Sequence, residues 1–174
     1  MKKLFALVII FVGLTGCFKK AQEKGSSLYS FPEKLGFFIK NHVNHFHYPT
    51  LEAFTPKLLD VYYKNHPIHH HPAFASHDFS GDGQLDYAFM LPLENTSNIL
   101  IIVNTIPHSV EENSNKDEAA LRFRFYYIGL IETIEDDFLA VKDDVLMKHS
   151  LNGDAVEITW NEKAGNYQLS KPLN

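Results

Sequence analysis

The segment His-Asp-Phe-Ser-Gly-Asp-Gly-Gln-Leu-Asp-Tyr-Ala, residues 77–88, decides how the rest of the chain is organised. An acidic residue recurs at every fourth position, and a glycine stands on each side of the middle one. Tight turns favour both residue types, because aspartate can cap its own backbone and glycine readily adopts positive φ. Strand-like apolar runs lie on either side. The sequence therefore predicts a turn that joins two antiparallel strands.

The same carboxylates suit a calcium ion, which takes six to eight oxygen ligands. Their spacing resembles the D-x-[DN]-x-D-G-x-x-D loop of the FG-GAP and VCBS calcium-binding repeats, with a serine in place of the usual Asp or Asn at the third position. Because the serine removes a strong ligand, we expect weak binding, at roughly 10⁻⁴–10⁻³ M as in extracellular modules. The resemblance implies that Asp78, Ser80, Asp82 and Asp86 bind the ion through their side chains. It implies that Gln84 binds it through its backbone carbonyl. A turn without metal remains the alternative.

Helix signals precede this segment, and strand signals surround and follow it. Ser30-Phe31-Pro32-Glu33 has the pattern of a capping box, and Thr55-Pro56 pairs a capping threonine with a first-turn proline. They predict helices over about 31–45 and from Thr55-Pro56 to about Asn65. Strands are predicted over 73–79, 86–92, 98–105, 121–132, 138–142, 144–149, 154–160 and 166–170. The predicted fold class is α+β, with the N-terminal helices packed on one face of an antiparallel β-meander sheet in one domain.

The whole order is similar to a broad group of small exported bacterial proteins. In these a helical start leads to a single D-F-N-G-D-G-x-x-D-Y-A segment and then to a sheet that ends in a W-N-G-x-x-Y hairpin. Asp78–Ala88 and Trp160–Tyr167 carry the resemblance. Most members of the group have no assigned activity, so it implies none. Because the sequence also lacks a G-x-S-x-G elbow, a phosphate loop and a dinucleotide fingerprint, we predict that the protein is not an enzyme.

The N-terminus has the features of an export signal. Met1-Lys2-Lys3 is basic and residues 4–14 are apolar or glycine, a run shorter than the roughly 20 residues that span a bilayer. The run ends in Leu14-Thr15-Gly16-Cys17, which resembles the bacterial lipobox, and Cys17 is the single cysteine of the chain. The resemblance implies lipidation of Cys17. The predicted organisation is a signal peptide over residues 1–16, a lipidated tether over 17–27 and one domain over 28–174.

These features predict where the protein resides and what it contacts. Several acyl chains on one residue give stable anchoring, so the expected location is the cell envelope, with the membrane as a partner through the lipid on Cys17. The residue after Cys17 is Phe18 and not an aspartate. The absence of an aspartate at this position favours the outer membrane if the host is Gram-negative. The formal net charge of −5 argues against nucleic acid as a partner. An unknown protein or envelope component remains as the expected partner.

Histidines offer a second kind of site. The chain has ten, and eight of them fall between residues 42 and 77. Neutral imidazoles are common ligands of Zn²⁺, Ni²⁺ and Cu²⁺, although the spacing here matches no zinc signature and a cluster in polar segments needs no metal. The candidate ligands are His42, His45, His69, His70, His71 and His77. The main prediction is thus a lipid-anchored, non-enzymatic binding or structural module with a weak calcium loop, and the alternative is a periplasmic-side lipoprotein that binds Zn²⁺ or another transition metal.

Overall fold

The computed structural model describes residues 31–94, 97–106, 122–153 and 155–173. Each predicted helix and strand has a counterpart within these ranges. The elements are α1 (Glu33–His42), a 3-10 turn (Leu51–Ala53), α2 (Pro56–Asn65), β1 (Phe74–His77), β2 (Asp86–Pro92), β3 (Asn98–Ile106), β4 (Arg122–Ile131), β5 (Asp137–Lys142), β6 (Val145–Ser150), β7 (Ala155–Asn161) and β8 (Asn166–Leu169). The predicted signal peptide, Cys17 and the tether lie outside the described residues. Within those residues, no helix has the length and apolarity needed to cross a bilayer.

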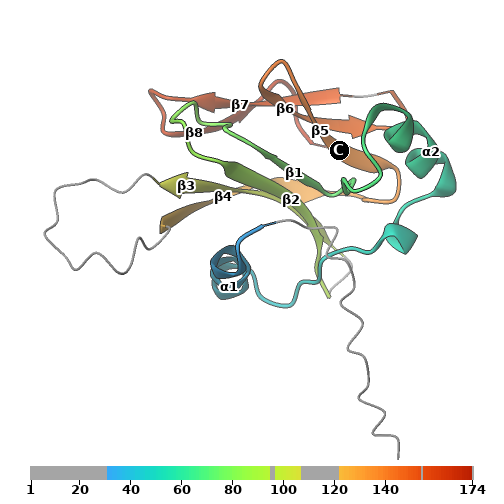
Figure 1. The fold of residues 1–174 in the computed structure, drawn as a ribbon, viewed down its shortest axis with the longest axis horizontal. Coiled ribbons are helices and arrows are strands. Elements are labelled where there is room, and N and C mark those ends of the chain that lie inside the picture. The colour runs from blue at the N-terminus through green and yellow to red at the C-terminus, as the bar shows by residue number, and fades with distance from the viewer. Residues whose placement is uncertain (1–30, 95–96, 107–121, 154, 174) are drawn as a thin grey trace, which may run out of the picture.

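The strands form two sheets rather than the single predicted one. Each sheet has four antiparallel strands in sequence order, β1-β2-β3-β4 in the first and β5-β6-β7-β8 in the second (Figure 1). The chain passes from one sheet to the other between residues 131 and 137. The single-sheet prediction was wrong because successive antiparallel strands show the same sequence pattern whether they continue one sheet or start another. The predicted α+β class is confirmed in this coarser sense: helices and strands are both present, but strands predominate.

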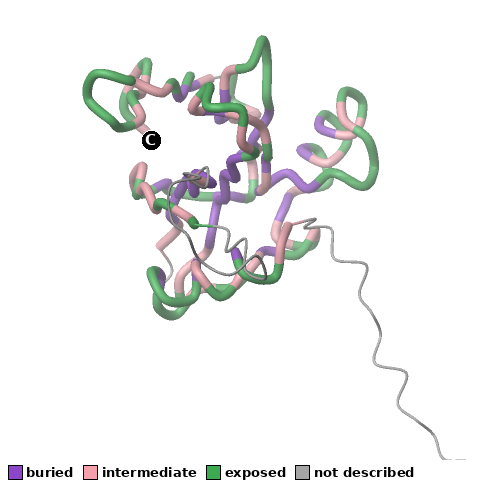
Figure 2. Tube along the Cα trace, turned by 60° about the vertical axis from the view of Figure 1, so that its left-hand side comes forward, coloured by how far each residue is buried: buried purple, intermediate pink, exposed green. Residues whose placement is uncertain are grey.

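The central strands of the first sheet, β2 and β3, are buried on both faces, whereas β4 is largely half-buried or exposed. On one face Leu35 and Ile39 of α1 share a core cluster with Phe89 and Ile101. On the other face, residues such as Ile102 pack into a second cluster with the second sheet and α2. This double burial explains why β2 and β3 are almost continuously apolar. Figure 2 shows the buried stretches running through the middle of the molecule.

The prediction that both helices pack on one face of one sheet is therefore wrong. α1 covers the outer face of the first sheet, whereas Leu58 and Tyr62 of α2 belong to the core between the sheets. The start of α2 agrees with its sequence signal, because Thr55 Oγ1 accepts a hydrogen bond from the Leu58 amide at 3.3 Å and Pro56 takes the first helical position. α1 begins at Glu33 after Pro32, which provides no side-chain cap.

Polar contacts between described residues join the two sheets. β1 lies beside β5, and just before β1 the Pro72 carbonyl accepts a hydrogen bond from the Leu139 amide at 2.7 Å. His77, at the end of β1, places Nε2 2.9 Å from Oδ1 of Asp144 in the turn between β5 and β6. Deeper in, Tyr167 of β8 donates to Asn104 of β3 (2.6 Å). These contacts fix the spacing of the sheets around the site described next.

Candidate functional site

The segment over residues 77–88 forms the predicted strand-turn-strand. β1 and β2 pair antiparallel, with His77 opposite Asp86. Gly81 and Gly83 adopt φ values of 74° and 82°, a conformation that residues with a Cβ rarely adopt. The two glycines that flank Asp82 in the sequence therefore make the reversal of the chain possible.

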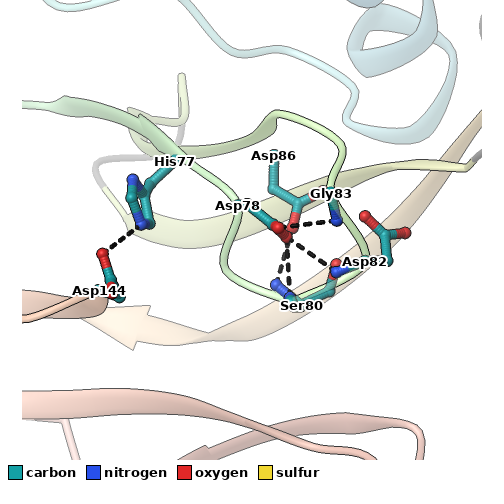
Figure 3. Close-up of polar contacts among 8 residues, drawn as sticks. His77, Asp78, Ser80, Asp82, Gly83, Asp86 and Asp144 are labelled. Atoms are coloured by element: carbon teal, nitrogen blue, oxygen red, sulfur yellow. Dashed lines mark hydrogen bonds and ion pairs between the residues drawn. The ribbon is translucent and has the colours of Figure 1, made fainter.

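Asp78 holds this loop together through its side chain. Its Oδ1 accepts hydrogen bonds from the amides of Gly81 (2.8 Å) and Asp82 (3.1 Å), and its Oδ2 accepts one from Gly83 (2.7 Å). Asp82 Oδ1 in turn accepts a hydrogen bond from the Gln84 amide at 2.9 Å. Figure 3 shows Asp78 at the centre of the loop, with the Asp82 carboxylate off to one side. The two carboxylates thus satisfy four backbone donors of the loop.

Asp86 is fully buried at the start of β2 and connects the loop to β3. Its two carboxylate oxygens each accept one amide hydrogen bond at 3.0 Å, from Ser80 and from Thr105. Burial raises the pKa of Asp86 to about 6, although these hydrogen bonds act in the opposite direction. The Ser80 hydroxyl also lowers that pKa, yet it makes no hydrogen bond of good geometry. The loop therefore carries a carboxylate whose ionisation is costly.

The residues predicted to bind calcium are thus brought into one loop, but the carboxylates of Asp78, Asp82 and Asp86 accept hydrogen bonds from backbone amides. In the described part of the chain, no three His, Cys, Asp or Glu side chains are arranged so that they could hold a metal ion. Each carboxylate oxygen has two lone pairs, so the oxygens of Asp82 and Asp86 that accept one amide hydrogen bond keep a lone pair for a cation, whereas Asp78 Oδ1 already accepts two. The turn without metal accounts for every hydrogen bond of the loop, and calcium binding stays a prediction.

A cleft of ≈ 660 Å³ opens beside this loop, between the two sheets. The loop contributes residues 78–82, and the first sheet contributes Asn104 and the neighbouring part of β3 together with Arg124 and Tyr126 of β4. The second sheet contributes Trp160 of β7, with Asp144 and Glu162 from turns. Sequence analysis missed this cleft, because its walls come from segments far apart in the chain.

Two aromatic residues, Tyr126 and Trp160, line this cleft, and Tyr167 packs against both of them. Tyr126, Trp160 and Tyr167 pack pairwise in edge-to-face geometry, with ring centroids 5.0–5.5 Å apart. Burial raises the pKa of Tyr167, whose hydroxyl donates to Asn104. The hydroxyl of Tyr126 is buried and has no hydrogen-bond partner among the described residues. A buried phenol oxygen without a partner is uncommon, and this one belongs to a residue that lines the cleft.

The six predicted histidine ligands divide into two groups. His42 stacks on Phe125 with ring centroids 5.4 Å apart, and His45 Nδ1 lies 3.1 Å from a carboxylate oxygen of Glu94, so both belong to the α1 side of the molecule. The other four, with His66, line a second pocket of ≈ 550 Å³: His69, His70, His71 and His77.

Within this second pocket the imidazoles have different surroundings. The rings of His69 and His70 lie 4.7 Å apart, and burial lowers the pKa of His70 and that of His66. His71 is fully buried, and its Nδ1 accepts a hydrogen bond from the Ala73 amide at 3.2 Å. The structure thus brings four of the six histidines to one pocket without the three-ligand arrangement that a metal needs, and transition-metal binding stays a prediction.

Comparison with known proteins gives no further guide to function. The chain matches no model of a protein family, and no curated protein or solved structure shows significant similarity to it.

Proposed function

We propose that this protein is a lipid-anchored binding module of the cell envelope, and that the cleft between its two sheets is the binding site. The observation that carries the proposal is the cleft itself, which has polar and aromatic walls and a volume of ≈ 660 Å³. Pockets for small ligands commonly measure about 300–1,000 Å³ and combine aromatic walls with a few polar groups. The basic and apolar N-terminus, which is typical of an export signal, and the lipobox-like Leu14-Thr15-Gly16-Cys17 support the anchoring.

The contacts of the lining residues favour binding over catalysis. Asp78 is occupied by three loop amides, and Asp144 is paired with His77. Asn104 accepts the hydrogen bond from Tyr167, and the Thr105 hydroxyl donates to the Leu85 carbonyl at 2.6 Å. These polar groups hold the shape of the cleft. A rigid wall of this kind suits recognition of a ligand that enters a preformed site.

The anchoring half of the proposal is tested by Cys17→Ser in the full chain. We expect the wild-type protein to incorporate labelled fatty acid and to lose residues 1–16. The variant is expected to carry no label and to keep the signal segment, because the acyl group has no thiol to join. Gel mobility, fatty-acid labelling and intact mass are the measurements, with Ser27→Ala as a matched control that stays labelled. A wild-type chain without label contradicts lipid anchoring.

A weak calcium site in the loop is the second part of this proposal. What supports it is the fully buried Asp86, since a nearby cation offsets the cost of its ionisation at neutral pH. We expect a few millimolar Ca²⁺ to raise the Tm of a soluble chain that begins after Cys17, because a ligand that binds only the native state stabilises it by mass action. Asp82→Ala is expected to abolish the shift.

The calcium melting scan needs EDTA as its baseline and micromolar Zn²⁺ as a third arm. Asp60→Ala, which removes an exposed carboxylate of α2, is the matched control and should keep the calcium shift. Equal Tm values in EDTA and in Ca²⁺ contradict calcium binding. A shift with Zn²⁺ alone supports the transition-metal alternative at the histidine-lined pocket.

A further inference from the structure

We propose that the cleft between the sheets binds an organic cation, that is, a ligand that presents an ammonium or guanidinium group. This inference rests on the proposed function and specifies the chemical class of the ligand. Four carboxylates line the cleft, from Asp78, Asp82, Asp144 and Glu162, and a single guanidinium from Arg124 opposes them. A cleft lined by one sign of charge focuses the field and raises the local concentration of the opposite charge. Anionic ligands are correspondingly disfavoured.

The carboxylates differ in how much of their charge is free for a ligand. Asp78 is surrounded by loop amides, and Asp144 faces His77. Asp82 accepts one backbone hydrogen bond, and both Asp82 and Glu162 are exposed at the rim of the cleft. The rim therefore offers two accessible anionic groups. They can steer a cation toward the interior.

The aromatic wall gives the cation a second kind of partner. Trp160 and Tyr126 both line the cleft. The face of an aromatic ring carries negative potential and attracts ammonium and guanidinium groups, with tryptophan the best of the side chains. Neutral oligosaccharides also stack on tryptophan, but they gain nothing from the excess of carboxylates. Charge and aromatic surface together single out the cation.

The hydrogen-bonding groups of the cleft point to the same class of ligand. Ammonium and guanidinium groups are donors only, so they need acceptors. The carboxylates are acceptors, and those of Asp82 and Glu162 belong to exposed residues of the cleft lining. A ligand that can only donate therefore finds complementary atoms at the rim of the cleft.

The experiment uses the full acylated chain in detergent micelles and follows the fluorescence of Trp160, the single tryptophan of the protein. The probes are spermidine, a Lys-Arg-Lys-Arg peptide, tetraglutamate and a neutral glucose tetrasaccharide. We expect a saturable change with spermidine or with the basic peptide, and weaker binding as the salt concentration rises. Tighter binding of spermidine identifies a free polyamine-like ligand, and tighter binding of the peptide identifies a basic segment of a protein.

Two variants of opposite sign complete the test. Glu162→Gln is expected to weaken binding about two- to fivefold, and Arg124→Gln to strengthen it by a similar factor, since each removes one exposed charge of the cleft. Saturable binding of the tetrasaccharide or tetraglutamate but not of the cations overturns the cation assignment and leaves the binding module standing. If none of the four probes binds, both the cation assignment and the proposed binding role of the cleft are overturned.

Discussion

Lys148→Met is expected to lower the free energy of unfolding by about 3–5 kcal/mol, the typical cost of removing one partner of a buried ion pair. Lys148 Nζ lies 2.6 Å from Asp137 Oδ2, and the two side chains are 6% and 5% exposed. Leu139 pairs with Lys148 across β5 and β6, so Asp137 lies diagonally opposite Lys148 on the same face as Leu139. That face belongs to the core between the sheets. Methionine fills the volume but leaves the Asp137 carboxylate buried without its partner.

The measurement is urea denaturation at neutral pH, followed by circular dichroism. The double variant Asp137→Leu/Lys148→Met is expected to recover most of the loss, because apolar residues of similar size replace both charges. Glu94→Gln is the matched control: it breaks the exposed contact with His45, where the side chains are 77% and 70% exposed, and should change stability by less than about 0.5 kcal/mol. Equal effects of Lys148→Met and Glu94→Gln contradict the assignment of a buried pair.

His71→Asn is expected to change how stability depends on pH. Burial lowers the pKa of His71 from 6.5 to about 4. Because the folded state favours the neutral ring, the contribution of His71 is complete above pH 6.5 and is lost as the pH falls toward 4. The loss amounts to about 3 kcal/mol at about 1.4 kcal/mol per pKa unit. Asparagine retains an acceptor for the Ala73 amide but has no proton to gain, so the variant lacks this loss.

Asp86 acts with the opposite sign over the same pH range. Burial raises its pKa from 3.8 to about 6, so its contribution is complete below pH 3.8 and is lost as the pH rises through 6. In the wild type these two groups compensate each other. Relative to the wild type, His71→Asn should therefore gain stability from pH 7 to 4, and Asp86→Asn should lose it.

Urea titrations of the three proteins at pH 7, 6, 5 and 4, in EDTA, measure both effects. The quantity to compare is the difference between variant and wild type at each pH, because other histidines also titrate. Differences that are independent of pH would show that neither buried group has the ionisation behaviour described above.

Sequence patterns predicted individual elements well because these depend on near neighbours. The cap at Thr55, the turn at Gly81 and Gly83, and the eight strands all follow from residues a few positions apart. The division into two sheets does not follow from such local patterns, because it depends on whether β5 pairs with the edge of the first sheet or starts a new one. Nothing in residues 132–136 marks them as the passage between layers.

The candidate site shows the same division. The loop from Asp78 to Asp86 is contiguous, so its shape and its antiparallel strands were predictable. The cleft brings Arg124 and Trp160 beside that loop only because two sheets stack, and no spacing rule relates residues so distant in sequence. The hydrogen bonds of the aspartates with loop amides were foreseen only as the alternative to calcium.

The sequential strand order has a consequence for how the chain folds. Every strand pair within each sheet joins neighbours in the sequence, so no sheet contains a strand inserted from elsewhere. Pairings between sequence neighbours close shorter loops than Greek-key pairings do, and low contact order is associated with fast folding. The strands of each sheet can thus pair one hairpin at a time. We expect docking of the two finished halves, with burial of Lys148 and Asp137 between them, to be the late step on the pathway.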